Sequence, residues 1–148
     1  MRVSIFGVTS TERRLTQSWQ LAQLLVQTAE QAKTAFGQTA QSMDLPVPLA
    51  RAILLLDEPA PMSALAEVLA CDRSYVTSLS DQLEERGLVS RVAGGDRRVK
   101  LLALTAAGRK VRDKLAAKVA EESVVFRALS DSERKTLTDL LTRLHSEQ

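Results

Sequence analysis

The sequence predicts a mostly α-helical chain with one small β-hairpin, arranged as a winged helix-turn-helix between N- and C-terminal amphipathic helices. The composition favours helices packed on aliphatic side chains, because 45% of the 148 residues are hydrophobic but only 3% are aromatic. Two short helical patterns are joined by a turn of about three residues, and a glycine-rich turn between two strand-like runs follows them. The length suffices for one domain of this kind with extra helices.

The first long helix is expected to begin directly after Thr9, since Thr9 and Glu12 have the spacing of a capping box. Its apolar residues recur at helical steps and form a stripe that needs a partner: Leu15, Trp19, Ala22, Val26, Ala29 and Phe36. The stripe stops before Gly37, and a polar linker is expected over residues 38–44. Residues 1–8 fit a strand, a disordered arm or an extension swapped between protomers.

A helix-turn-helix is predicted for the middle of the chain. A helix over about residues 48–56 stops before Pro59 and Pro61, because proline cannot continue a helix. Ser63 is placed to cap a short helix that runs to Ala70, with a buried side formed by Leu65, Ala66 and Leu69.

The second helix of the pair is predicted over residues 73–86, with Asp72 as its N-cap and Gly87 as the residue that ends it. A helical wheel gives it a buried side that holds Val76, Leu79 and Leu83. The outward side holds Ser74, Thr77, Ser78, Asp81 and Glu85. Its hydroxyl groups lie in the first turns and its carboxylates would repel phosphates, so the N-terminal half is expected to enter a major groove.

A β-hairpin is predicted over residues 88–104, where a turn at residues 93–96 separates two runs of apolar and basic residues. Asp96, Arg97 and Arg98 lie at this turn. An arginine there would insert into the narrow, negative minor groove of DNA, and the aspartate would hold its guanidinium by a bidentate pair. The alternative is an ordinary charged hairpin tip.

Two further helices are predicted after the hairpin. Thr105 is the expected cap of a long helix to about Leu129, which has an apolar side at Val111, Leu115, Val119 and Phe126. Ser130 and Glu133 form a second capping box, which begins a last helix with burial-spaced Leu137, Leu140, Leu141 and Leu144. Since the opposite sides of the end helices mix both charge signs, dimer burial is expected rather than a membrane face or a cofactor box.

Positive charge is concentrated in the predicted winged segment. The whole chain has a formal net charge of +2 and is not polybasic. Residues 71–112 hold nine basic and five acidic residues, a balance of +4, whereas the other 106 residues hold eleven and thirteen, a balance of −2. Contacts between this segment and phosphates would release counterions and supply affinity, so double-stranded DNA is the expected partner.

Four blocks of the sequence resemble the multiple-antibiotic-resistance regulator (MarR) family of bacterial transcription factors. The blocks are Ala66 to Thr77 (AEVLACDRSYVT), Leu83 to Arg91 (LEERGLVSR), Gly95 to Arg98 (GDRR) and Leu104 to Arg109 (LTAAGR). Their order is specific: a helix, a Gly-Leu-Val step, an Asp-x-Arg wing and a Leu-Thr-x-x-Gly-Arg start of the next helix. The resemblance covers about residues 45–112.

The resemblance implies a single MarR-like domain over residues 1–148 and an obligate homodimer. Residues 10–44 and 106–148 would form the dimerisation helices, and residues 45–105 would form the winged DNA-binding lobe. The dimer would bind a pseudo-palindromic operator and act as a repressor, released by a small and often aromatic or phenolic ligand.

The residues expected to contact DNA come from the wheel, the wing and the resemblance together: Arg73, Ser74, Tyr75, Thr77, Ser78, Asp96, Arg97 and Arg98. The resemblance implies that Arg98 enters the minor groove and that Asp96 orients it. The chain departs from the family at Ser78 and Gln82, where many members carry arginine, and this bears on affinity and on the operator sequence. A candidate effector pocket, for which plain helix packing is the alternative, is formed by Trp19, Phe36, Met43, Leu45 and Arg51.

Other kinds of site have little support. Cys71, the only cysteine, excludes an intramolecular disulfide and a multi-cysteine metal site; a structural role at its turn is expected, and an oxidant sensor is the alternative. His145, the only histidine, supplies too few metal ligands, so neither a metal nor another cofactor is expected. The lack of a targeting signal and of a long apolar run predicts a cytoplasmic protein without a membrane partner.

The principal hypothesis is a sequence-specific, dimeric DNA-binding regulator without catalytic activity. The alternative is a winged-helix protein-interaction module or anti-repressor that lacks operator binding, which Ser78, Gln82, Asp81 and Glu85 favour. An enzyme is the third hypothesis, and the sequence offers it no convergent acid, base and nucleophile.

Overall fold

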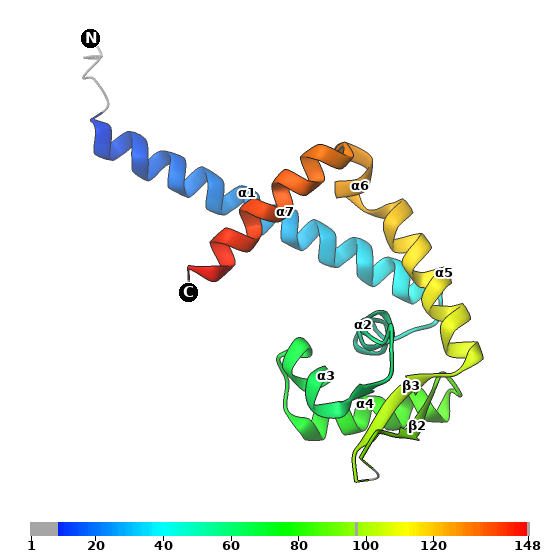
Figure 1. Cartoon of the computed structure of the whole chain (residues 1–148). Coiled ribbons are helices and arrows are strands. Elements are labelled where there is room, and N and C mark those ends of the chain that lie inside the picture. Colours follow the sequence, from blue (N-terminus) through cyan, green and yellow to red (C-terminus); the bar gives the residue numbers. More distant parts are fainter. Residues whose placement is uncertain (1–8, 97, 148) are drawn as a thin grey trace. The chain divides into compact units, whose positions relative to one another are not determined.

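The computed structural model describes residues 9–96 and 98–147, and the expectations for residues 1–8 and for Arg97 lie outside this range. The described part forms two compact units, one that ends at Thr34 and one over Ala35–Gln148. The helices are α1 (Ser10–Ser42), α2 (Val47–Leu55), α3 (Met62–Leu69), α4 (Arg73–Glu85), α5 (Ala106–Glu122), α6 (Val124–Ala128) and α7 (Asp131–Ser146) (Figure 1). The strands are β1 (Ala60–Pro61), β2 (Val89–Ala93) and β3 (Lys100–Leu104), so the mostly helical fold class with a small β wing is confirmed.

Most of the predicted helix caps are confirmed. The Thr9 hydroxyl accepts from the Glu12 backbone N–H at 3.2 Å, and the Glu12 carboxylate accepts from the Thr9 N–H at 2.8 Å. A second reciprocal pair, between Ser130 and Glu133, begins α7. The cap predicted at Ser63 is wrong. Helix α3 already begins at Met62, and Pro61, with an extended backbone (ψ of 147°), takes the N-cap position without a side-chain hydrogen bond.

Helix α1 continues through Gly37, so the polar linker predicted over residues 38–44 is wrong. Thr39 and Ala40 are fully buried, and the Thr39 hydroxyl contacts both the Ala35 carbonyl oxygen (3.0 Å) and the carboxylate of Glu122 on α5. Packing of small side chains against a second helix thus stabilises a segment whose composition looked like a loop.

The long helix predicted to Leu129 is interrupted at Ser123, which has an extended backbone with ψ of 122°. Helix α5 ends at Glu122, and α6 begins at Val124. Serine and two consecutive valines have low helix propensity, which favours a break at this point. The apolar periodicity continues across the break and therefore does not reveal it.

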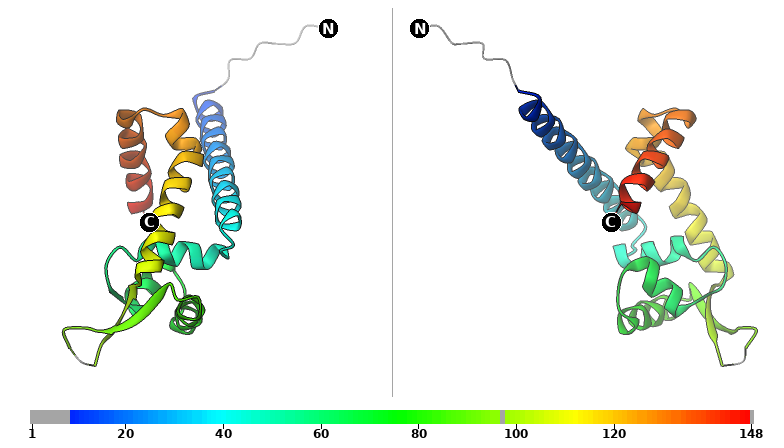
Figure 2. Two further views of the ribbon diagram at one scale, coloured as in Figure 1. Left: turned by 90° about the vertical axis from the view of Figure 1, so that its right-hand side faces the viewer. Right: turned by 60° about the vertical axis from the view of Figure 1, so that its left-hand side comes forward.

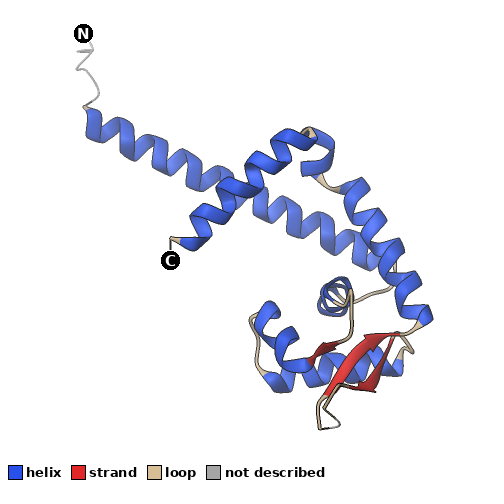
Figure 3. Cartoon of the chain, viewed as in Figure 1, coloured by secondary structure: helices blue, strands red, loops and turns tan. Residues whose placement is uncertain are grey.

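The three strands form one antiparallel sheet in the order β1-β3-β2, shown in red in Figure 3. In the hairpin Val89 pairs with Leu104 and Ala93 pairs with Lys100 at the end that lies near the turn. Strand β1 pairs Ala60 with Leu102 and was not predicted, because a two-residue strand with a proline has no periodic signal. The hairpin protrudes from the helices of its unit in both views of Figure 2.

The hydrophobic core lies in the second unit, between α2, α4, the sheet and α5. Its fully buried large side chains are Leu49, Ile53, Leu56, Val76, Leu83, Leu102 and Leu115. The base of the hairpin is fixed on α5, where the Thr105 N–H donates to the Leu88 carbonyl oxygen at 3.0 Å and the Thr105 hydroxyl donates to that of Gly87 at 2.7 Å. The approach is so close that a Cβ on Gly108 would lie 1.9 Å from the Leu88 oxygen, which explains the glycine physically.

The apolar stripes near both ends of the chain stay exposed. Leu15 and Trp19 on α1 are 71% and 65% exposed, and Leu144 on α7 is 58% exposed. None of the described residues of α7 is buried. In the range that the structure describes, no helix combines the length and apolar character that crossing a membrane requires.

Candidate nucleic-acid interface

Helix α4 is fixed at both ends by local chemistry. The Asp72 carboxylate accepts from the Tyr75 N–H at 2.8 Å and from the Ser74 hydroxyl at 2.6 Å. These hydrogen bonds lower the pKa of Asp72, and the bond from Ser74 has the larger effect. The helix ends in a Schellman motif, in which Gly87 has φ of 69° and the Leu88 N–H donates to the Leu83 oxygen at 2.9 Å.

The predicted division of α4 into two sides is confirmed. Val76, Leu79 and Leu83 are at most 4% exposed. The outward side is exposed along its whole length and holds Arg73, Ser74, Thr77, Ser78, Asp81 and Glu85. Helix α4 therefore presents a continuous polar surface of the kind that a recognition helix needs.

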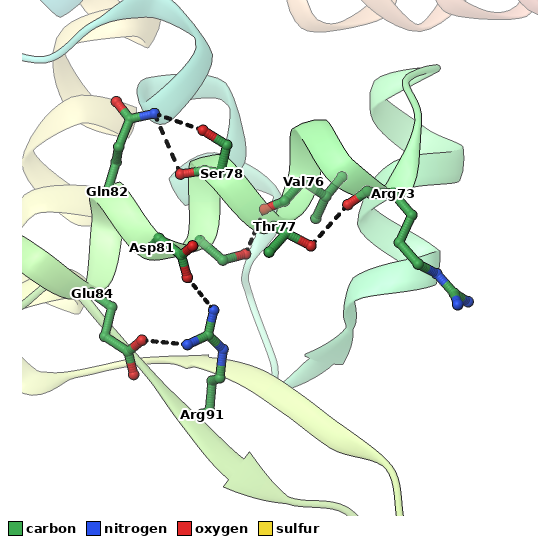
Figure 4. Close-up of polar contacts among 9 residues, drawn as sticks. Arg73, Val76, Thr77, Ser78, Asp81, Gln82, Glu84 and Arg91 are labelled. Carbon is green, nitrogen blue, oxygen red and sulfur yellow. Dashed lines mark hydrogen bonds and ion pairs between the residues drawn. The ribbon is translucent and has the colours of Figure 1, made fainter.

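The hydroxyl groups of this surface already make local hydrogen bonds, which Figure 4 shows for Thr77 and Ser78. The Ser74 hydroxyl donates to Asp72, and the Thr77 hydroxyl donates to the Arg73 carbonyl oxygen at 2.9 Å. The Ser78 hydroxyl accepts from the Gln82 amide at 3.3 Å. In this arrangement Ser74 and Thr77 offer acceptor oxygens, and Ser78 keeps its hydrogen for a base edge or a phosphate.

Arg73 and Tyr75 flank the first turn of α4 in different ways. The Arg73 side chain is exposed and points away from the helix in Figure 4. The Tyr75 side chain is 45% exposed, and it also lines a hollow of about 70 Å³ together with Pro48 and Arg51. The Arg73 side chain is therefore accessible from solvent, while Tyr75 is partly engaged with α2.

Arg91 on β2 pairs with two carboxylates of α4, which sequence analysis did not predict. Its Nη1 atom lies 2.6 Å from Glu84 Oε2, and its Nη2 atom pairs with Asp81 (Figure 4). The Asp81 hydrogen bond is the main cause that raises the pKa of Arg91. Asp81, expected to repel phosphates, is thus neutralised within the chain, whereas Glu85 has no ion pair in the described range.

The wing tip differs from the expected geometry in one respect. The Asp96 carboxylate accepts from the backbone N–H of Arg98 at 3.0 Å, and among the described residues no ion pair joins it to the Arg98 guanidinium. The Asp96 carbonyl oxygen also accepts from the Val99 N–H at 2.9 Å. Asp96 therefore shapes the turn and leaves the exposed Arg98 side chain unpaired, in place of the predicted bidentate pair.

The effector pocket predicted from five residues stays a prediction, and four of these residues lie in the second unit. Met43 and Leu45 line a hollow of about 440 Å³ with Asp44, Arg86, Leu88, Val111 and Lys114. Arg51 lines the separate small hollow beside Tyr75, and Phe36 packs against the core. Trp19 is exposed and belongs to the other compact unit.

Cys71 and His145 lie where the sequence placed them. Cys71 is half-buried at the α3–α4 turn and packs against the core, and its N–H donates to the Ala66 oxygen at 3.0 Å. His145 is exposed in the last turn of α7. The position of Cys71 agrees with a small side chain that closes the turn.

Comparison with protein families gives one match at the winged segment. The MarR family model matches residues 53–100, which include the two helices of the helix-turn-helix and most of the hairpin. A proposed transcriptional regulatory protein for the hcr operon of Thauera aromatica is 40% identical over 85 residues. That similarity covers 56% of this chain and 51% of the relative, so the chain matches about half of the relative's length.

Two solved structures are similar over most of the chain. A MarR-family transcriptional regulator from Rhodococcus sp. RHA1 is 27% identical, with a TM-score of 0.72 over 86% of this chain and 94% of that one. CouR from Rhodococcus jostii RHA1, solved with p-coumaroyl-CoA bound, is also 27% identical, with a TM-score of 0.70 over 84% of this chain and 90% of CouR. Both similarities extend beyond the winged segment into the flanking helices.

Proposed function

We propose that this chain, which resembles the MarR family in its winged segment and MarR-family structures in its fold, is a transcriptional regulator that binds a pseudo-palindromic DNA operator as a homodimer and acts as a repressor. Residues 45–105 would form the DNA-binding lobe, and residues 10–44 and 106–148 would supply the dimer contacts. The DNA contacts would come from the side chains selected from the sequence: Arg73, Ser74, Tyr75, Thr77, Ser78, Asp96, Arg97 and Arg98.

One observation carries this proposal: an exposed polar helix and a protruding wing lie in the same unit, each with a cation available for phosphates. In the described range no ion pair involves Arg73 at the start of α4 or Arg98 and Lys100 in the wing. Side chains of α4 would read base edges in a major groove while the Arg98 guanidinium enters the neighbouring minor groove.

Dimerisation is supported by the exposed apolar residues of α1 and α7. Leu140 and Leu144 lie one helical turn apart on α7 and are 48% and 58% exposed. Burial of such a stripe in a second copy of the chain would supply the hydrophobic free energy that the single chain does not gain. Two-fold symmetry would then present two lobes to an inverted repeat.

A small-molecule effector is supported by CouR, which was solved with p-coumaroyl-CoA. We assign the effector to the hollow of about 440 Å³. It is lined by apolar side chains, by two cations that would hold the anionic end of a small organic ligand, and by one acidic residue: Met43, Leu45, Leu88, Val111, Arg86, Lys114 and Asp44. A panel of aromatic and aliphatic carboxylates should raise Tm and release DNA. Lys114→Gln should weaken both effects without changing DNA binding in the absence of ligand.

Selection of bound fragments from random duplex DNA tests the principal proposal. Enrichment of an inverted repeat with half-sites about one helical turn apart would support a dimeric regulator. Enrichment of a single unrepeated half-site would contradict the dimer. If nothing is enriched from a folded protein, operator binding is refuted, and the protein-interaction module becomes the better account.

A further inference from the structure

The pair between Arg91 and helix α4 is built by the strand itself. Side chains two residues apart on a strand point to the same face, and Val89, two residues before Arg91, is 2% exposed in the core. The Arg91 side chain therefore leaves β2 on the side that faces α4. Strand β2 follows α4 after only the short Gly87 turn, so the chain itself keeps the strand next to the helix.

The arginine engages both of its terminal nitrogens. Nη1 lies 2.6 Å from Glu84 and Nη2 pairs with Asp81, and the two carboxylates are three residues apart on one side of α4. The Arg91 side chain is 30% exposed, whereas those of Asp81 and Glu84 are 53% and 41% exposed. The guanidinium is thus directed at protein carboxylates, and its fork is not available to a phosphate.

Neutralisation matters at this position because the C-terminal half of α4 is acidic. Asp81, Glu84 and Glu85 all lie on exposed turns of the helix that would face the DNA. With Arg91 in place, Asp81 and Glu84 share one positive charge, while Glu85 has no ion pair among the described residues. Without it, a helix with three uncompensated negative charges would approach two rows of phosphates.

We propose that Arg91 is a positioning residue for DNA binding, which screens Asp81 and Glu84 from phosphates and fixes the first wing strand against the recognition helix. The inference rests on the proposed function, because it presupposes a duplex as the partner. In this role Arg91 does not contact DNA itself and affects DNA binding only through the carboxylates of Asp81 and Glu84. An exposed ion pair contributes little to folding, so Arg91 affects binding more than stability.

Three variants of the full chain separate this role from a direct phosphate contact. Arg91→Gln leaves both carboxylates uncompensated, and we expect operator affinity to fall by at least about tenfold. Asp81→Asn with Glu84→Gln frees the arginine, and we expect affinity to rise with a steeper salt dependence. The triple variant Arg91→Gln, Asp81→Asn, Glu84→Gln lacks both carboxylates that Arg91 pairs with, and its affinity should return to within about threefold of wild type.

DNA binding is measured by fluorescence anisotropy at several salt concentrations, with the duplex that the wild-type protein selects. Thermal unfolding of each variant is followed by circular dichroism, to show that the variant is folded. Asp57→Asn is the control for a change of one unit in net charge, since it removes the exposed partner of Arg112 at a position outside the proposed DNA contacts and the dimerisation helices. This control should leave affinity within about twofold of wild type. Slopes of log Kd against log salt distinguish electrostatic positioning from a loss of folded protein.

Recovery of affinity in the triple variant supports the inference. Persistent weak binding of a folded triple variant would overturn it and would make Arg91 a direct contact. Unchanged affinity of Arg91→Gln would also overturn it, while the proposed function would stand because wild type still binds. If wild type binds no duplex, both proposals fail together. If Arg91→Gln alone fails to fold, the triple variant decides, since it lacks the uncompensated carboxylates.

Discussion

The winged lobe and the end helices carry similar apolar patterns, but only the lobe buries its pattern within the chain. We use "end helices" for residues 10–34 of α1 and for α7. On α4 the three residues of the apolar side are at most 4% exposed, whereas on the end helices Trp19 is 65% exposed and Leu144 is 58% exposed. The same periodicity thus leads to a closed core in one region and to an open face in the other.

Apolar residues at helical spacing thus predict that one face of a helix will be buried. They do not predict whether the same chain or a second copy buries it. The lobe has several elements whose inward sides meet, because α2, α4, the sheet and α5 surround one set of buried side chains. The described residues of α7 have no comparable cover. We therefore expect changes in the two regions to have different readouts, folding for the lobe and assembly for the ends.

The largest effect is expected when charges are placed on the open face. Leu140→Asp with Leu144→Asp introduces two carboxylates on one side of α7, and in a symmetric dimer each is present twice. Burial of four charges costs far more than the lost apolar contacts, so the dimer should weaken by at least about 1,000-fold. Analytical ultracentrifugation over a range of concentrations measures this change.

The control for the dimer prediction is Thr142→Asp, which places the same side chain on the opposite side of α7. It should leave the dimer intact. If the leucine variant stays dimeric, or if it unfolds the winged lobe, the proposed division of labour between the two regions is wrong.

The next largest effect is expected at the closest approach within the lobe. Gly108→Ala would bring a Cβ to 1.9 Å from the carbonyl oxygen of Leu88, so the base of the hairpin must separate from α5. We expect a loss of about 3 kcal/mol in the free energy of unfolding, measured by urea denaturation. Gly95→Ala is the matched control, since no atom lies within 4 Å of its Cβ, and it should change this free energy by less than about 0.5 kcal/mol.

Arg98→Ala tests the wing without disturbing either fold or assembly. Loss of the guanidinium from both protomers should weaken operator binding by about 100-fold and reduce the salt slope by about two, since each arginine replaces roughly one counterion. Arg98→Lys should keep the slope but not the full affinity, because lysine lacks the planar fork. Unaltered binding of Arg98→Ala in a band-shift assay would remove the wing from the interface.

Local chemistry made much of the fold predictable from the sequence. Four expected caps, at Thr9, Asp72, Thr105 and Ser130, accept the hydrogen bonds that their spacing implied. The wheel for α4 also separated buried from exposed residues correctly. Each of these inferences needs only residues within one or two helical turns, where sequence distance and spatial distance agree.

The failures share a dependence on contacts that are distant in sequence. Helix α1 passes Gly37 because Thr39 packs against Glu122, which is 83 residues away. Strand β1 exists because Ala60 meets β3, and no local pattern announces it. The ion pairs of Arg91 with α4 also join separate elements. The sequence holds a signal for them, because Arg91 lies two residues after the strand residue Val89 and two acidic residues precede it on the helix.

The smallest effect is expected in the pH dependence of the unfolding free energy, which we compare for the N-terminal caps of α4 and α7. Hydrogen bonds lower the pKa of Asp72 below its ordinary value of 3.8, so the folded state favours the carboxylate. Its contribution to stability is present above that value and is lost as the pH falls through the lower, folded pKa. Asp72→Asn keeps a capping oxygen but cannot titrate, so the difference in unfolding free energy between it and wild type should shrink below pH 4.

Glu133 supplies the matched case on α7, because its hydrogen bonds with the Ser130 N–H and hydroxyl lower its pKa in the same direction. Glu133→Gln should therefore show the same sign of pH dependence in unfolding. Only Asp72→Asn should also alter DNA binding at neutral pH, since Asp72 lies at the start of α4 beside Arg73 and its negative charge opposes a phosphate there. Removal of that charge should tighten binding slightly at low salt, and equal effects of both variants on DNA would argue against α4 as the helix that meets the duplex.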